Sequence, residues 1–74
     1  MKQYGVILFY TTSSAMRAEK LLKKEGCCIK LVPTPREFSS DCGIALQFDW
    51  TQYEKVKSTL DVTGVEIDGI HKGN

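Results

Sequence analysis

The apolar run at residues 4–10 limits what this chain can fold into more than any other stretch. It is short and rich in β-branched and aromatic residues, which favours a strand. Val6 and Leu8 point to one face of such a strand, and Ile7 and Phe9 point to the other. A strand that is apolar on both faces is typical of the middle of a sheet. The chain is therefore predicted to build a sheet around this segment.

Two helices and three further strands are predicted after this run. Residues 11–14 offer several N-cap side chains to a first helix over 15–25, and Gly26 suits the position after its end. Asp49 and Gln52 have the spacing of a capping box at the start of a second helix. Alternating or β-branched residues predict strands over 27–32, 44–48 and 65–68, with a tail over 69–74.

The predicted order β-α-β-β-α-β is that of a ferredoxin-like α+β domain. Right-handed crossovers then give a four-stranded antiparallel sheet with both helices on one face. The 74 residues are expected to form one domain over 1–74. The first two strands run parallel in this topology, so residues 11–14 should lie near residues 36–42. The sheet face without helices, on which Ile7 and Phe9 are expected, is a candidate surface for a homodimer.

Charge and cysteine content limit the classes of function. The net charge is +1, with ten Lys and Arg intermixed with nine Asp and Glu, which argues against a nucleic-acid partner. No apolar run reaches the roughly 20 residues of a membrane helix, and the first residues lack a signal-peptide pattern. These features predict a cytoplasmic protein without membrane contacts. Three reduced cysteines without a CxxC or Cys/His spacing predict no disulfide, no metal and no cofactor.

The loop over 33–43 holds the candidate site. Cys42 within it is a potential nucleophile, because a cation or a helix N-terminus lowers the pKa of a thiol. Hydroxyl and backbone N–H groups would stabilise the charged sulfur, and a glycine would let a ligand come close. The residues predicted to form this site around Cys42 are Arg36, Ser39, Ser40, Thr12, Ser13 and Gly43.

A structural role for Cys42 is the alternative. Free cysteine is among the most buried residue types, and Cys42 is predicted on the strand face that also carries Ile44 and Leu46. The residue pattern alone favours this packing role. Cys27 and Cys28 are expected at the opposite end of the sheet as strand-packing residues. His71 is expected to be a solvated residue of the tail.

Residues 9–23 and 31–46 together resemble the selenium/sulfur (Se/S) carrier-like family, a family of unknown function. The likeness extends over nearly the whole chain, and the family's most recognisable motif is intact over 33–46. The resemblance implies a carrier rather than a turnover enzyme. Cys42 would accept a persulfide or selenosulfide from a donor protein and pass it to an acceptor.

Two other functions fit the same residues. The chain is alternatively a non-catalytic binding module for an anionic ligand or a partner protein, with Cys42 as a packing residue. It is also a candidate structural subunit that dimerises through the uncovered sheet face.

Overall fold

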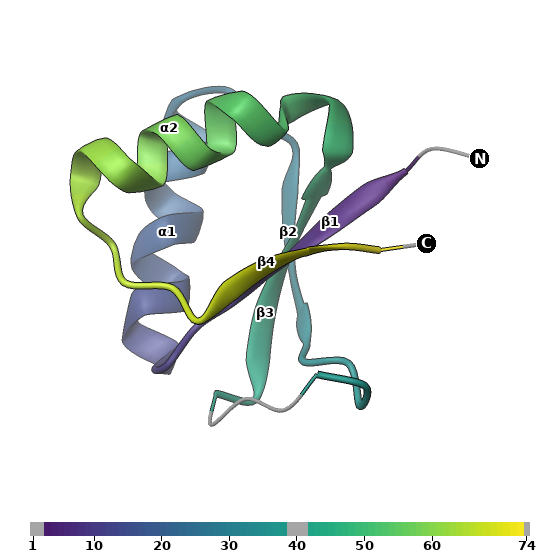
Figure 1. Ribbon diagram of the computed structural model, residues 1–74. Helices are drawn as coiled ribbons and strands as arrows, with labels where there is room; N and C mark the ends of the chain where they lie inside the picture. Colours follow the sequence, from purple (N-terminus) through teal and green to yellow (C-terminus); the bar gives the residue numbers. More distant parts are fainter. Residues whose placement is uncertain (1–2, 39–41, 74) are drawn as a thin grey trace.

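The computed structural model describes residues 3–38 and 42–73, whose elements follow the order β-α-β-β-α-β (Figure 1). One sheet, in the strand order β2-β3-β1-β4, contains β1 (Tyr4–Leu8), β2 (Ile29–Pro33), β3 (Ile44–Asp49) and β4 (Gly69–Lys72). Each neighbouring pair of strands is antiparallel. Helix α1 (Thr12–Lys24) connects β1 to β2. The 3-10 turn η1 (Trp50–Gln52) and helix α2 (Tyr53–Thr63) connect β3 to β4. The predicted ferredoxin-like arrangement is confirmed.

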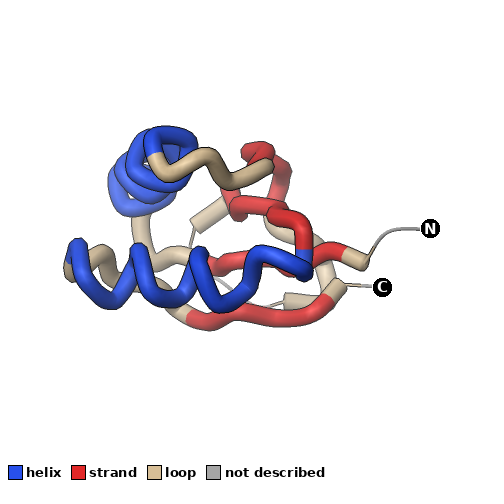
Figure 2. The backbone as a smooth tube through the Cα atoms, turned by 90° about the horizontal axis from the view of Figure 1, so that it is seen from above, coloured by secondary structure: helices blue, strands red, loops and turns tan. Residues whose placement is uncertain are grey.

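Both helices pack on the same face of the sheet (Figures 1 and 2). The main hydrophobic core joins Ile7, Leu46 and Phe48 of the sheet to Ala15, Ala18 and Leu22 of α1 and to Val56 and Leu60 of α2. Burying one large apolar side chain of this kind contributes about 1.5–3 kcal/mol. Within the described residues, neither helix is long and apolar enough to cross a membrane.

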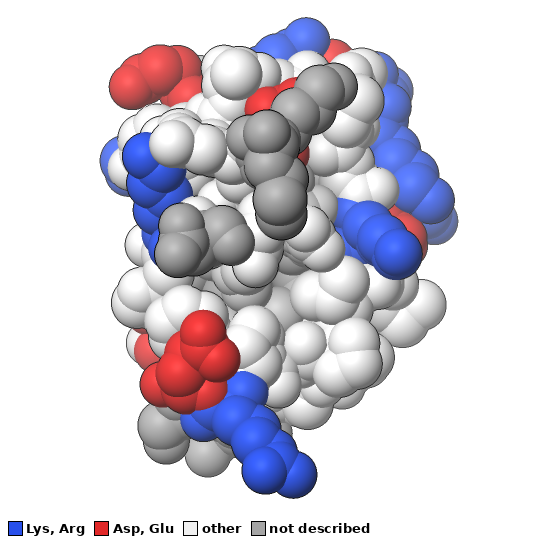
Figure 3. All heavy atoms as spheres, turned by 90° about the vertical axis from the view of Figure 1, so that its right-hand side faces the viewer, with Lys and Arg blue, Asp and Glu red and all other residues white. Residues whose placement is uncertain are grey.

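The sheet face opposite the helices carries a second, smaller cluster. It consists of Val6, Leu8 and Ala45, all buried, with Tyr4, Val32 and Phe38 packed against them. Ile7 and Phe9 were expected on this face, and that expectation is wrong: both are fully buried in the main core. In the side view of Figure 3 an uncharged area extends over the centre and lower right, with charged side chains at its edges.

The position of the last strand also differs from the prediction. Residues 65–68 are not a strand, and β4 is formed by Gly69–Lys72, which was expected to be part of a tail. β4 pairs with β1 so that His71 lies opposite Val6, and the pairing is extended by the Asp68 N–H donating to the Leu8 carbonyl at 2.7 Å. The alternation at 65–68 has another cause, because Val65 and Ile67 both contact the main core.

Side chains and a glycine define the two ends of α1. The hydroxyl of Thr11 accepts a hydrogen bond from the Ser14 N–H at 3.1 Å, so Thr11 is the N-cap. At the other end Gly26 has a φ of 81°, and the Cys27 N–H donates to the Leu22 carbonyl. This is a Schellman ending, in which the left-handed residue is usually glycine. It places Cys27 in the connection ahead of β2 rather than in the strand.

The segment between β3 and α2 is capped differently from a capping box. The carboxylate of Asp49 accepts from the Thr51 N–H at 3.1 Å. Gln52 does not complete the box, because its side-chain oxygen accepts from the Cys28 N–H at 2.8 Å. Gln52 therefore joins the start of α2 to the connection that leads into β2.

Candidate functional site

Cys42 lies at the end of the sheet where α1 begins (Figure 1). Its thiol is 3% exposed and belongs to the main core, so the side chain points to the helix-covered face. The Sγ atom donates to the Ile44 carbonyl at 3.2 Å and lies 4.0 Å from the Oγ1 atom of Thr12. The sequence predicted that residues 11–14 lie near residues 36–42. This is confirmed for Thr12 and Cys42.

The first residues of α1 differ in their relation to the thiol. Thr11, which caps the helix, was not among the predicted site residues. Thr12 and Ser13 are both exposed, and Thr12, the first helical residue, is the one in contact with Sγ. The free N–H groups of a helix N-terminus carry partial positive charge, which stabilises a nearby anion. The described contact between the start of α1 and the Cys42 sulfur is made through the Thr12 hydroxyl.

The other predicted site residues lie in the loop between β2 and β3. Arg36 is exposed, in a turn where the Phe38 N–H donates to the Pro35 carbonyl at 3.1 Å. Gly43 is exposed as well, and among the described atoms none lies within 4 Å of the position that a Cβ would occupy there. Ser39 and Ser40 lie outside the described residues. The roles of these side chains around the thiol remain predictions.

Thr34 holds the two ends of this loop together. Its N–H donates to the Gly43 carbonyl at 3.0 Å, and its hydroxyl donates to the Cys42 carbonyl at 2.7 Å. The main chain of Cys42 and Gly43 is thereby fixed to the end of β2. The prediction did not include Thr34, because a pattern of residue types does not show which residues a loop brings opposite each other.

Phe38 and His71 were also missed. The two rings stack with centroids 4.5 Å apart and an interplanar angle of 21°. His71 was expected to be a solvated residue of the tail. It is exposed, but it belongs to β4, and its ring contacts Phe38 in the loop between β2 and β3. Placing the last strand over 69–72 would have put His71 beside Val6, on the face where Phe38 packs.

The other two cysteines lie at the opposite end of the sheet, where α1 ends and β2 begins (Figure 1). Cys27 is buried, and this burial raises the pKa of its thiol above the ordinary value, although nearby Lys55 acts in the opposite direction. Cys28 is exposed, and all three cysteines are free thiols. Within the described part of the chain no three His, Cys, Asp or Glu side chains are grouped to hold a metal ion.

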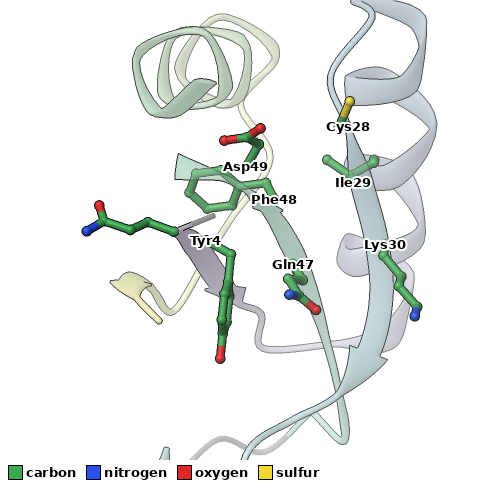
Figure 4. Close-up of a pocket in the computed structure, with 8 residues that line it drawn as sticks. Tyr4, Cys28, Ile29, Lys30, Gln47, Phe48 and Asp49 are labelled. Carbon is green, nitrogen blue, oxygen red and sulfur yellow. The ribbon is translucent and has the colours of Figure 1, made fainter. Parts of the chain in front are cut away.

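A shallow groove of about 410 Å³ also lies at this second end. Figure 4 shows that the lining comes from three strands, with Tyr4 on β1, Gln47 and Asp49 on β3, and Lys30 on β2. The full lining is Gln3, Tyr4, Cys28, Ile29, Lys30, Gln47, Phe48 and Asp49. Lys30 is the cation of this lining and Asp49 is its carboxylate, which also accepts from the Thr51 N–H and hydroxyl. The groove therefore combines one positive and one negative side chain with the apolar side chains of Ile29 and Phe48.

The chain matches a known family over both parts of the Cys42 site, the start of α1 and the loop before β3. A family model described as "Putative Se/S carrier protein-like" matches residues 4–72, which include the start of α1 and the loop that contains Cys42. No curated protein and no solved structure matches the chain at a significant level. The chain belongs to the Se/S carrier protein-like family.

Proposed function

We propose that this protein carries sulfur or selenium on Cys42. The observation that supports the proposal most strongly is the position of the thiol, 4.0 Å from the Thr12 hydroxyl at the N-terminal end of a 13-residue helix. Thiolates are stabilised at such helix ends. The description of the family points to the same chemistry.

The transfer is an exchange at the sulfur atom. The Cys42 thiolate attacks the outer sulfur of a donor persulfide, a new S–S bond forms, and the S–S bond of the donor breaks. The donor thiolate leaves and takes up the proton that Cys42 released. An acceptor nucleophile then attacks the outer sulfur on Cys42 and regenerates the thiolate. No further oxidant or reductant is needed, and a selenium donor follows the same steps.

The burial of Cys42 has a consequence for this cycle. Because Cys42 is only 3% exposed, its sulfur is shielded from bulk water and from unrelated proteins, which limits side reactions of a bound persulfide. Donor and acceptor proteins then reach Cys42 only when the surrounding loop shifts. In this proposal Arg36, Ser39, Ser40, Ser13 and Gly43 contribute charge, hydrogen bonds or space during transfer, in a cytoplasmic setting where thiols stay reduced.

Mass spectrometry tests the proposal. The protein is incubated with a cysteine desulfurase and cysteine, and the sulfur added to each cysteine-containing peptide is measured. Cys42→Ser is expected to abolish the adduct, whereas Cys27→Ser and Cys28→Ser should retain it. An adduct that persists in Cys42→Ser, while a known carrier is labelled in parallel, contradicts the proposal.

The groove beside Lys30 supports a second candidate function, a binding module for an anionic small molecule. Its volume of about 410 Å³ is within the range of small-molecule sites. Inorganic phosphate and glutathione are suitable probes, with backbone NMR shifts as the measurement. The shifts should concentrate at the groove and disappear in Lys30→Glu. They should persist in the matched control Lys20→Glu on the exposed side of α1, and equal shifts in both variants contradict this function.

A further inference from the structure

The loop between β2 and β3 has side chains on both faces of the sheet. Cys42, at one end of the loop, belongs to the main core beneath the helices. Phe38, in its first half, packs on the opposite face against the cluster of Val6, Leu8 and Ala45. Two described residues of this loop are thus held on opposite faces of the sheet.

The contact on the uncovered face is between two rings. Phe38 is half-buried and stacks on His71 of β4, with 4.5 Å between the centroids. His71 is fixed in turn by the pairing of β4 with β1, where it lies opposite Val6. The phenyl ring therefore lies between a buried apolar cluster and an imidazole from an edge strand.

Hydrogen bonds connect Phe38 to the main chain of Cys42. The Phe38 N–H donates to the Pro35 carbonyl at 3.1 Å, which closes a turn directly after Thr34. Thr34 donates to the carbonyls of Gly43 and Cys42 at 3.0 and 2.7 Å. Pro35 restricts the backbone inside this short segment. A shift of Phe38 away from the sheet therefore acts on the bonds that hold Cys42.

We infer that Phe38 and His71 are positioning residues for Cys42, and that their ring contact sets how readily the thiol becomes accessible. The inference rests on the proposed function for its biological meaning, since a carrier must uncover its sulfur to exchange it. Loss of one aromatic ring contact is expected to raise the rate of Cys42 modification roughly 2- to 10-fold.

Alkylation by iodoacetamide, followed separately at each cysteine, tests this inference. Cys27 is buried at the other end of the sheet and reports on global unfolding. His71→Ala is expected to accelerate alkylation of Cys42 but not of Cys27, and His71→Phe should restore the slow rate by replacing the ring. Lys72→Ala is the matched control on the same strand, because Lys72 lies over the Trp50 ring, 5.7 Å from its centroid. This substitution should leave the alkylation rate of Cys42 unchanged.

A second variant makes the test independent of the effect of the His71 substitution on folding. Phe38→Ala should accelerate alkylation of Cys42 in the same way. The double variant should be little faster than either single variant, because both substitutions remove the same ring contact. An unchanged Cys42 rate in His71→Ala, or an equal acceleration of Cys42 and Cys27, overturns the inference. Alkylation needs no sulfur donor, so this test is independent of sulfur loading. If the variants accelerate alkylation of Cys42 as expected but Cys42 accepts no sulfur from a donor, the carrier function is contradicted and the positioning role of Phe38 and His71 is not.

Discussion

Replacing Thr34 with Val removes the hydroxyl that donates to the Cys42 carbonyl at 2.7 Å and keeps a side chain of similar shape. The bond between the Thr34 N–H and the Gly43 carbonyl is formed by the main chain and remains. A hydrogen bond of this kind contributes about 0.5–1.5 kcal/mol. Because the bond lies at the base of the loop, its loss should favour local opening around Cys42. The expected increase in the open population is roughly 2- to 12-fold.

The ratio of Cys42 to Cys27 alkylation rates measures this effect, since global unfolding raises both rates. Thr63→Val is the matched control, because the Thr63 hydroxyl donates to the Thr59 carbonyl at 2.8 Å within α2. It removes the same kind of bond far from the loop and should leave the ratio unchanged. The reasoning is refuted by a ratio that stays constant in Thr34→Val, or by one that rises equally in Thr63→Val.

Three further predictions concern stability and assembly. Gly26→Ala should lower the free energy of unfolding by about 1 kcal/mol, because Gly26 has a φ of 81°, whereas Gly43→Ala should be nearly neutral; urea unfolding distinguishes them, and equal losses contradict the argument. Burial raises the pKa of the Cys27 thiol, so the unfolded chain loses this proton at lower pH than the folded chain. The contribution of Cys27 to stability is therefore complete below roughly pH 8.5 and is lost as the pH rises through the folded pKa; Cys27→Ala should flatten the alkaline fall of the urea midpoint, and an unchanged fall contradicts this. The homodimer through the uncovered sheet face remains a prediction: Val32→Asp, on that face, should shift sedimentation toward monomer, and identical profiles argue against it.

The sequence predicted the order of the elements because the length, residue types and spacing of the apolar runs distinguish strands from helices. It did not identify the helix-covered face of β1, because Val6 and Leu8 are as apolar as Ile7 and Phe9. Only the packing of the helices distinguishes them, and it places Ile7 and Phe9 in the main core. The last strand was misplaced for a related reason, since alternation at 65–68 arises from a connection that contacts the core rather than from a strand.

The candidate site was predicted in part. The predicted topology brought Thr12 near Cys42, and the packing alternative correctly anticipated that Cys42 is buried. Cys42 is therefore both buried and in contact with the start of α1. Thr34 and the Phe38–His71 contact were not predictable from residue spacing. The Thr34 bonds depend on how the loop between β2 and β3 closes on itself, and the ring contact depends on how Phe38 meets β4, which is distant in sequence.

A chase experiment with labelled sulfur tests the central claim, that Cys42 accepts sulfur and passes it on. The protein is loaded with radioactive sulfur by a cysteine desulfurase, separated from it, and mixed with an excess of a small thiol as acceptor. The label on each of the three cysteines is then followed over time. Label is expected to appear on Cys42 and to move to the acceptor. Label confined to the exposed Cys28, with none at Cys42, would contradict it.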